Sequence, residues 1–532
     1  MSSGSRSSGR ARGRSSRPGP DGPNDQLRLM ADAYPDEPAY SVLRGDTLTF
    51  AAWEADANQL ARGLACRGVA KGDRVAIALG MEDALRWLVA YVAIHKAGAV
   101  AVPVNPRLAD REVAAVLSHS GARGVLAGAG MIERCLRCAP GLPALDLVVD
   151  AGSEAPPCSP VEGPGSASVP VAWSELLDSD ASTFQVPLSG DDLADILYTS
   201  GTTGSPKGVA VRHRSASLLP VGLPVWRGEA WLHASPLFTF AGVSFVYNPM
   251  KLGMTALYQP RFDAGEWLAT VEHRRPVAVF LVPAMAQLLV THPLFDAAVL
   301  DSVKLCAIGS APLAPAILRR MQERMPGAAV SNSYGMTEAG SAYCAMPQGE
   351  SLRRVGSVGK PMAPMEVRCV DAGDVDLPAG AVGEVLIRMP GREREYFGDP
   401  EATARTWAGG WLHTGDLGRL DEDGYLYIVG RKKDVIIRGG NNIHAADVEA
   451  VLLEHPGVAE AAVVGIPHAV LGEDVAAFVV PVESPGPSED ELIAHCAGRL
   501  ADYKCPRRIS FVAGLPRNAT GKVVKGELLR NI

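Results

Sequence analysis

The sequence of 532 residues contains no apolar segment long enough to cross a membrane. Its longest nearly uninterrupted apolar stretch, residues 277–290, falls short of the roughly 20 residues that a bilayer-spanning helix needs. A surplus of basic residues is also lacking, because 51 Lys and Arg face 59 Asp and Glu and leave a net charge of −8. A general nucleic-acid binder needs a basic footprint, so this charge balance argues against that class.

Cysteine is scarce, and its spacing is not that of a disulfide framework. The nine Cys are an odd number and are scattered from Cys66 to Cys505. Free thiols of this kind indicate a reducing compartment, and we expect the cytoplasm. Cys135 and Cys138 form one CxxC pair, but the second pair that a zinc site usually needs does not follow. We therefore interpret them as ordinary free cysteines and expect no metal there.

Residues 1–25 lack the material for a core. After Met1 they contain no aliphatic residue larger than Ala, so we expect a disordered tail. Five Arg and two Asp give the tail a charge of +3, which leaves −11 for the remainder. No apolar segment follows the arginines, and a secretory signal is not expected. A solvated tail is favoured over a transit or nucleic-acid arm.

The composition changes at Leu27, where apolar residues become frequent and strand and helix patterns begin to alternate. Residues 49–68 predict an amphipathic helix with Thr49 as its cap and Gly68 as its stop. Further helices are expected over 82–96 and 108–118, and strands over 99–104, 124–127 and 195–198. A similar alternation returns over 277–327. Strands that alternate with helices are typical of a parallel, doubly wound α/β sheet.

The last third of the chain shows two other patterns. Residues 355–430 predict short, mostly antiparallel strands between Gly, Asp and Pro turns. After Arg431 the pattern indicates a compact α+β unit, with strands at 435–438, 459–466, 476–482 and 509–512 and helices at 446–454 and 488–500. We expect the break at 431–434. The predicted organisation is a tail (1–25), a large domain (26–431) and a small C-terminal domain (432–532).

The most specific motif is the segment YTSGTTGSPKGV at 198–209. It places hydroxyls, glycines and Lys207 directly after a predicted strand, so that backbone N–H groups and a cation can converge on an anion. Pro206 stands where a Walker A loop needs Gly before its Lys, so the loop is a phosphate cradle of another kind. The residues of this loop that are predicted to bind phosphate are Thr199, Ser200, Gly201, Thr202, Thr203 and Gly204.

Further motifs follow in a fixed order: GSAP at 309–312, NSYGMTEA at 332–339, WLHTGDL at 411–417, YLYIVGR at 425–431 and PRNATGKV at 516–523. With this ordered set, residues 27–530 resemble the adenylate-forming superfamily of acyl-CoA synthetases, peptide-synthetase adenylation domains and luciferases, closest in pattern to acyl-CoA synthetases. The resemblance implies a large N-terminal domain with doubly wound sheets and a β-rich subdomain, followed by a small mobile cap. It also implies activation of a carboxylic acid by ATP to an acyl-adenylate, with release of pyrophosphate.

The resemblance also assigns nucleotide contacts. Tyr334 is expected to stack on adenine, Thr337 to touch phosphate and carboxylate oxygens, and Glu338 with Thr203 to hold Mg²⁺, a hard cation that suits oxygen ligands. Asp416 is expected to accept hydrogen bonds from the ribose diol. Arg431 is expected to contact ribose or phosphate. The other expected ATP-binding residues are Gly309, Ser310, Ala311, Pro312, Asn332, Ser333, Gly335 and Ile428.

Lys522 matches the catalytic lysine of the family. A carboxylate that attacks the α-phosphate brings two anions together, which costs about 4 kcal/mol at about 4 Å with an effective dielectric near 20. A lysine that bridges both groups reverses this repulsion, while Lys207 and Mg²⁺ take the charge of the departing pyrophosphate. Lys433 matches the family's hinge. The resemblance assigns the residues around it to the hinge and to CoA: Lys432, Arg438, Gly439 and Gly440.

The acyl pocket is expected around the segment SPLFTFAG at 235–242. Its predicted lining is Phe238, Thr239, Phe240, Val243 and Met285, with Phe245 nearby. Thr239 stands where many acyl- and aryl-CoA ligases carry His. Residues 230–262 contain no acidic residue, and an unpaired ammonium would be costly to bury. The sequence therefore favours an apolar, fatty or aromatic acid over an α-amino acid.

Three functions remain open on the sequence. The leading hypothesis is an AMP-forming acid–CoA ligase that uses ATP, Mg²⁺ and CoA. The second is a stand-alone adenylating enzyme that passes the acyl group to a carrier protein, an amine or nitrite. The third is a non-catalytic nucleotide-binding relative. It is disfavoured because the expected charged residues are all present: Lys207, Glu338, Asp416 and Lys522. The oligomeric state stays open, with a homodimer among the alternatives.

Overall fold

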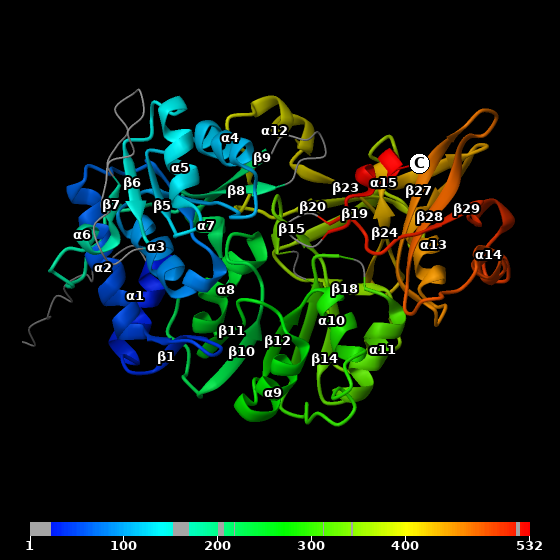
Figure 1. The fold of residues 1–532 in the computed structure, drawn as a ribbon, viewed down its shortest axis with the longest axis horizontal. Helices are drawn as coiled ribbons and strands as arrows, with labels where there is room; N and C mark the ends of the chain where they lie inside the picture. The colour runs from blue at the N-terminus through cyan, green and yellow to red at the C-terminus, as the bar shows by residue number, and fades with distance from the viewer. Residues whose placement is uncertain are drawn as a thin grey trace, which may run out of the picture.

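The computed structural model describes residues 23–152, 170–199, 207–217, 219–311, 313–341, 344–517 and 522–531. Three large sheets form the body of the protein, and a fourth forms a cap at one end of the long axis (Figure 1). Within the described residues, no helix is both long and apolar enough to cross a membrane.

The first sheet has eight strands in the order β7-β6-β5-β3-β4-β8-β9-β21. The strands from β7 to β8 are parallel, whereas β9 and β21 join antiparallel at one edge. Its strands are β3 (Arg74–Ala78), β4 (Val100–Pro103), β5 (Gly124–Ala127), β6 (Leu147–Asp150), β7 (Val171–Ala172), β8 (Leu193–Thr199), β9 (Lys207–Arg212) and β21 (Glu395–Tyr396). The helices of this region are α2 (Phe50–Cys66), α3 (Ala84–Lys96), α4 (Asp110–Ser120), α5 (Ile132–Cys138), α6 (Trp173–Leu176) and α7 (His213–Ala216).

The second sheet has seven strands in the order β14-β13-β12-β10-β11-β1-β2, and all but β2 are parallel. They are β1 (Pro38–Val42), β2 (Thr47–Thr49), β10 (Glu229–His233), β11 (Met254–Tyr258), β12 (Ala278–Leu281), β13 (Leu305–Gly309) and β14 (Ala329–Ser333). Four helices accompany them: α8 (Phe240–Lys251), α9 (Ala264–Arg274), α10 (Pro283–Val290) and α11 (Pro315–Arg324). Two mostly parallel sheets with intervening helices confirm the expected α/β class.

The third sheet is antiparallel throughout, as the sequence predicts for residues 355–430. Its strands follow the order β17-β18-β24-β23-β20-β19, with β22 beside β23. They are β17 (Cys344–Ala345), β18 (Ser357–Pro361), β19 (Glu366–Val370), β20 (Gly383–Arg388), β22 (Trp407–Ala408), β23 (Trp411–Leu420) and β24 (Leu426–Arg431). A short helix that the sequence analysis did not predict, α12 (Pro400–Thr406), begins at an Asp399 cap whose side chain accepts from the Ala402 amide.

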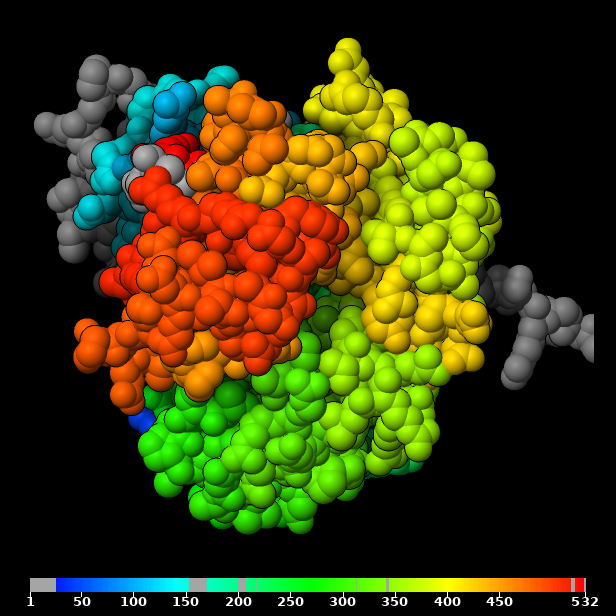
Figure 2. Space-filling view, turned by 90° about the vertical axis from the view of Figure 1, so that its right-hand side faces the viewer, coloured from blue at the N-terminus to red at the C-terminus, as the bar shows by residue number. Residues whose placement is uncertain are grey.

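The cap is built on β26-β25-β28-β27, with β29 parallel to β28. Its elements are β25 (Val435–Arg438), β26 (Asn441–His444), α13 (Ala445–Leu452), β27 (Val458–His468), β28 (Gly472–Pro481), α14 (Glu489–Ala497), β29 (Arg508–Phe511) and α15 (Lys525–Leu528). The chain passes from β24 to β25 through the 3-10 turn η3 (Lys432–Asp434), where we propose the domain boundary. Seen from that end, the cap (orange and red) covers the middle of the body (Figure 2).

The first helix, α1 (Pro23–Ala33), begins inside the range 1–25 that was expected to be a disordered tail. Proline suits the first turn of a helix because its missing N–H would have no partner there. Asp25 pairs with Arg28 at 3.0 Å in the same turn, and Leu27 and Met30 are fully buried. Residues 23–25 are therefore part of a helix rather than of a tail, and the expectation for residues 1–22 lies outside the described residues.

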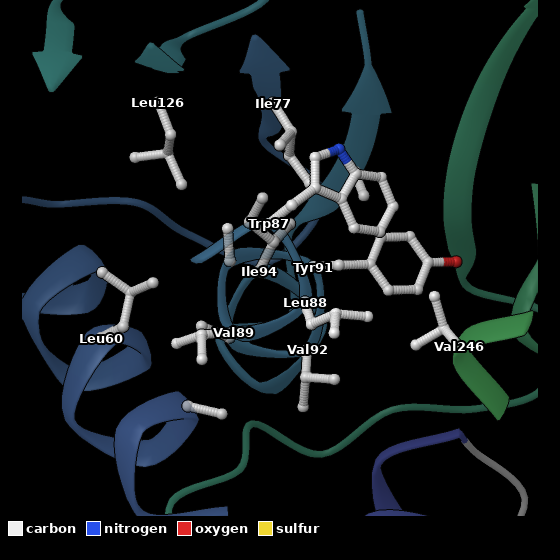
Figure 3. Close-up of a cluster of buried hydrophobic side chains, with 14 of the residues drawn as sticks. Leu60, Ile77, Trp87, Leu88, Val89, Tyr91, Val92, Ile94, Leu126 and Val246 are labelled. Carbon is white, nitrogen blue, oxygen red and sulfur yellow. The ribbon is translucent and has the colours of Figure 1, made fainter. Parts of the chain in front are cut away.

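Helix α3 is the centre of the largest core cluster. Every residue from Trp87 to Lys96 is buried, and a helix that is apolar on nearly all sides belongs inside a protein. Figure 3 looks along this helix, with Leu60 of α2 on one side and Val246 of α8 on the other. The two ionisable residues at its C-terminal end have partners: His95 Nε2 lies 3.1 Å from Asp195, and Lys96 Nζ lies 2.7 Å from Glu54.

Replacing Leu88 in this helix by Ala should destabilise the body. Leu88 is fully buried, and large-to-small changes at such sites cost about 2–5 kcal/mol because a cavity is left behind. Leu288→Ala is the matched control, since Leu288 is 55% exposed. Thermal and urea unfolding should show a lower midpoint for Leu88→Ala and almost no change for the control. Equal midpoints for the two variants would contradict this packing.

Candidate active site

Tyr334 and Asp416, which the resemblance assigns to adenine and to ribose, are in direct contact. Tyr334 follows β14, and Asp416 lies within β23, so two sheets meet at this contact. The Tyr334 hydroxyl donates to Asp416 Oδ2 at 2.6 Å. Burial and the neighbouring carboxylate raise the pKa of Tyr334, which therefore stays neutral and keeps its donor.

Arg431 completes this group from the neighbouring strand. It ends β24 and lies directly opposite Asp416 in the β23–β24 ladder. Its Nε lies 3.0 Å from Asp416 Oδ1, so each carboxylate oxygen has one partner. Asp416 is 5% exposed, and an ionised carboxylate has about four acceptor positions. The remaining acceptor capacity suits a diol such as ribose.

A second group joins Glu338 to Lys207 through Tyr396. The Tyr396 hydroxyl donates to Glu338 Oε1 at 3.1 Å. The same ring lies 4.8 Å below Lys207 Nζ, within the range of a cation–π contact. Burial, followed by the Glu338 carboxylate, raises the pKa of Tyr396, so its hydroxyl remains a donor at neutral pH.

Tyr396 was not among the residues predicted from the sequence. It lies in β21, a two-residue strand that adds to the edge of β9, with Tyr396 opposite Val209. Lys207 begins that same β9 strand. The link between Tyr396 and the phosphate loop is therefore a long-range strand pairing, for which the local sequence carries no signal.

Part of the expected phosphate loop lies outside the described residues. This part includes Ser200, Gly201, Thr202, Thr203 and Gly204, and the same holds for Pro312 of the GSAP turn. The ends of the loop are described. Thr199 closes β8 and lies opposite Lys207 in the β8–β9 ladder, so the loop joins two adjacent antiparallel strands.

Lys522 of the cap faces the charged residues of the body. The surrounding protein lowers the pKa of its ammonium, and Arg431 lowers it further, whereas Asp416 and Glu338 raise it. The side chain as a whole is exposed to solvent. Charges of three body residues, Arg431, Asp416 and Glu338, therefore act on one lysine of the cap.

The other expected nucleotide residues lie at the ends of neighbouring strands. Gly309 and Ser333 are opposite each other in the β13–β14 ladder. Ser310 has a φ of 76°, a left-handed conformation that is uncommon outside glycine and marks a tightly fixed turn. The remaining residues of this edge are Ala311, Asn332 and Gly335, with half-buried Ile428 on β24.

Glu338 is a suitable ligand for magnesium in the presence of nucleotide. Mg²⁺ is usually held by one or two carboxylates together with substrate phosphates and water. Within the described residues, no cluster of three or more His, Cys, Asp or Glu could hold a metal by itself. One carboxylate fixed by the Tyr396 hydroxyl fits a magnesium ion that arrives with ATP. The part of Thr203 in this site stays a prediction.

Thr239 has a structural role in the expected acyl region. It is the N-cap of α8: its Oγ1 accepts from the Gly242 amide at 3.1 Å and donates to the Pro236 carbonyl at 2.7 Å. N-cap hydroxyls stabilise helices by satisfying a free amide. This double hydrogen bond explains how Thr serves at a position where His is common in the family.

An aromatic cluster surrounds Phe245 on α8. The ring of Phe245 stacks on His233 at 4.2 Å and lies 5.2 Å from Phe280 and 5.3 Å from Trp231. Burial lowers the pKa of His233 to about 3, so this imidazole is neutral. The cluster is an apolar, uncharged wall.

The other residues predicted to line the acyl pocket lie in different parts of the structure. Phe238 and Phe240 are half-buried beside the start of α8, and Phe240 packs against the largest core cluster. Val243 is 3% exposed and belongs to that core. Met285 of α10 packs against the core of the second sheet. Their contact with an acyl group stays a prediction.

The residues assigned to the hinge and to CoA have mixed surroundings. Lys432 Nζ lies 2.9 Å from Glu384 of the body, and Arg438 Nε lies 2.6 Å from Asp474 within the cap. Gly439 and Gly440 form the β25–β26 turn with φ values of 55° and 84°, which glycine adopts without strain. Lys433 is exposed in η3. Their contacts with CoA remain predictions.

Comparison with known proteins identifies the family. Residues 27–397 match the AMP-binding enzyme family, and residues 447–522 match the AMP-binding enzyme C-terminal domain. The chain belongs to the AMP-binding enzyme family, which confirms the resemblance to adenylate-forming enzymes.

Its relatives include a feruloyl-CoA synthase of an Amycolatopsis species, 35% identical over 495 residues, which cover 91% of this chain and 94% of that protein. A fatty acid–[acyl-carrier-protein] ligase, ScoC of Streptomyces coeruleorubidus, is 35% identical over 512 residues, 94% of each chain. The crystal structure of the anthranilate CoA ligase AuaEII in complex with anthranoyl-AMP has a TM-score of 0.83 at 25% identity, covering 96% of this chain and 97% of that one.

The lowered pKa of Lys522 predicts an alkaline limb for adenylation. The ammonium form is needed for bridging two anions, and this form is lost as the pH rises through the lowered pKa. The kcat/KM of acid-dependent pyrophosphate exchange should therefore fall before the ordinary lysine range near about 10.4 is reached. Lys522→Arg should move the limb to higher pH because a guanidinium stays protonated. The same limb in both enzymes would contradict the assignment.

Proposed function

We propose that this protein is an AMP-forming acid–CoA ligase. It activates a carboxylic acid with ATP to an acyl-adenylate, releases pyrophosphate, and transfers the acyl group to the CoA thiol. The observation that carries the proposal is the approach of Lys522 of the cap to Glu338, Asp416 and Arg431 of the body. These are the residues that the resemblance assigns to the ribose, to magnesium and to catalysis, and their proximity supports the proposal.

The chain's own residues can perform the positioning that adenylation needs. The Asp416 carboxylate, held by Tyr334 and Arg431, orients the ribose. Lys522 supplies a cation between the substrate carboxylate and the α-phosphate, where a bare approach would cost about 4 kcal/mol. Magnesium bound with ATP, together with Lys207, neutralises the charge of the pyrophosphate.

The acid that we propose is apolar, fatty or aromatic. The wall formed by Phe245, Phe280, Trp231 and neutral His233 offers no charge to a substrate ammonium or second carboxylate. Aromatic rings pair with one another edge-to-face or offset, so a flat acid would gain contacts here. The curated and solved relatives named for feruloyl, anthranilate and fatty-acid substrates agree with this class.

A second candidate acceptor is the pantetheine arm of a carrier protein. It is favoured by one observation, the equal identity of the chain to a fatty acid–[acyl-carrier-protein] ligase and to a feruloyl-CoA synthase. Product analysis with ATP, acid and either CoA or a purified carrier protein separates the two. Formation of acyl-CoA alone supports the acid–CoA ligase, whereas loading of the carrier alone would favour the carrier-protein ligase instead.

We propose the cytoplasm as the location, in agreement with eight free cysteines among the described residues.

Lys522→Ala should separate the two half-reactions. Acid-dependent pyrophosphate exchange should fall by about 10²–10³, the usual effect of removing a group that stabilises transition-state charge. Thioester formation from supplied acyl-adenylate should be retained, because this step does not need the lysine between carboxylate and phosphate. Equal losses in both assays would contradict the role of Lys522.

Pyrophosphate exchange by the unaltered enzyme with a panel of short, fatty and aromatic acids identifies the substrate. No exchange with any acid would favour a non-catalytic relative.

Phe245→Ala should widen the range of accepted acids. Removing this ring opens space beside His233 and Phe280, so kcat/KM should shift toward larger acids by about one order of magnitude. Phe295→Ala is the matched control, because Phe295 is also buried but packs in the core of the second sheet. If both variants change the preference alike, the shift does not come from the acyl site.

A further inference from the structure

Arg394 is a buried arginine that the proposed chemistry does not use. The residue is 6% exposed, and its guanidinium donates to main-chain carbonyls: Nη2 to Ser215 at 2.9 Å and Nη1 to Thr337. Its guanidinium carbon lies 5.2 Å from the centre of the Phe240 ring. One side chain thus fastens α7, the start of α8 and the Thr337 turn to each other.

The contact with Thr337 has a direct consequence for Glu338. The Thr337 carbonyl belongs to the peptide that joins Thr337 to Glu338, so the guanidinium fixes the orientation of that peptide. Tyr396, two residues after Arg394, bonds to the Glu338 carboxylate at 3.1 Å. Residues two apart in an extended chain point to the same face. The edge formed by residues 394–396 therefore holds Glu338 by its main chain and by its side chain.

The same edge is tied to the phosphate loop. Tyr396 pairs with Val209 of β9, and the Phe397 amide donates to the Gly208 carbonyl at 2.8 Å. Lys207, the first residue of β9, lies over the Tyr396 ring. The short strand β21 thus fixes the relative positions of Lys207 and Glu338. These are the two charged residues that are expected to meet the triphosphate.

We propose that Arg394 and Tyr396 are positioning residues that hold Glu338 in register with Lys207 for binding of magnesium-loaded ATP. The proposal rests on the proposed function for the role of Glu338, but its test needs only nucleotide and metal. Burying an arginine is costly unless its donors are satisfied, and its Nε has no hydrogen-bond partner among the described residues. Burial lowers the pKa of Arg394 to about 10, so the group is still charged at neutral pH.

The sign of the effect separates positioning from electrostatics. A positive charge near Glu338 repels Mg²⁺, so if charge alone mattered, Arg394→Met would strengthen magnesium-dependent binding. If the guanidinium acts by fixing the Thr337–Glu338 peptide, its removal weakens that binding. Arg394→Lys keeps the charge but lacks the planar fork that reaches two carbonyls, and restores the effect only in part.

The experiment is calorimetric titration of the full-length protein with α,β-methylene-ATP, with and without Mg²⁺. The measured quantity is the factor by which Mg²⁺ tightens the binding. In Tyr396→Phe, which keeps the ring below Lys207 but loses the hydroxyl, this factor should fall about tenfold, as expected for a hydrogen bond to a charged group. Arg394→Met should show a similar fall, while binding without Mg²⁺ stays unchanged in both variants.

The matched control is Arg392→Met. Arg392 lies two residues before Arg394 and donates to the Ser217 carbonyl at 2.9 Å, so it tests loss of a nearby guanidinium without the Glu338 contact, and its factor should equal that of the unaltered protein. Thermal melting identifies unfolded variants, and Tyr396→Phe decides if Arg394→Met does not fold. The proposal would be overturned if the factor by which Mg²⁺ tightens nucleotide binding were unchanged in the variants or larger in Arg394→Met. An equal loss of nucleotide affinity with and without Mg²⁺ would overturn it as well. Failure of every acid in the exchange assay would leave this titration valid.

Discussion

The buried Asp416 carboxylate is the interaction on which the arrangement of this site depends. A buried charge must be paired and hydrogen-bonded, or it is strongly destabilising. Here the partners come from different parts of the molecule: Tyr334 from the end of the second sheet and Arg431 from the third. The Asp416 carboxylate also acts on Lys522 of the cap, whose pKa it raises. The need to satisfy one carboxylate therefore links the second and third sheets of the body.

The charge distribution follows the same logic. Apart from its first 25 residues the chain carries a net charge of −11, which by itself disfavours a triphosphate. Lys207, Arg431 and Lys522 nevertheless come from three distant segments, and we propose that all three face the bound nucleotide. Each is neighboured by a carboxylate or an aromatic ring that limits their mutual repulsion. The acidic surface and the cationic cleft are therefore compatible.

The sequence predicted those features that are encoded locally or by ordered motifs. The Thr49 cap and its spacing gave helix α2 almost to the residue. Tyr334 and Asp416, which the motif order assigned to the nucleotide, are in contact, while a nucleotide site shared with Lys522 stays a prediction. Tyr396 and Arg394 could not be found in this way. They act through the pairing of β21 with β9 and through bonds to main-chain carbonyls, and neither leaves a pattern in the residues themselves.

The short connection between β24 and β25 has a kinetic consequence. Only the three residues of η3, Lys432–Asp434, separate Arg431 at the ribose side from the first strand of the cap. Three extended residues span at most roughly 10 Å, so the cap cannot diffuse away from the cleft. Lys522, which we propose as the catalytic lysine, is therefore a tethered group with a high effective concentration. Its approach to the body is a first-order event, independent of how dilute the protein is.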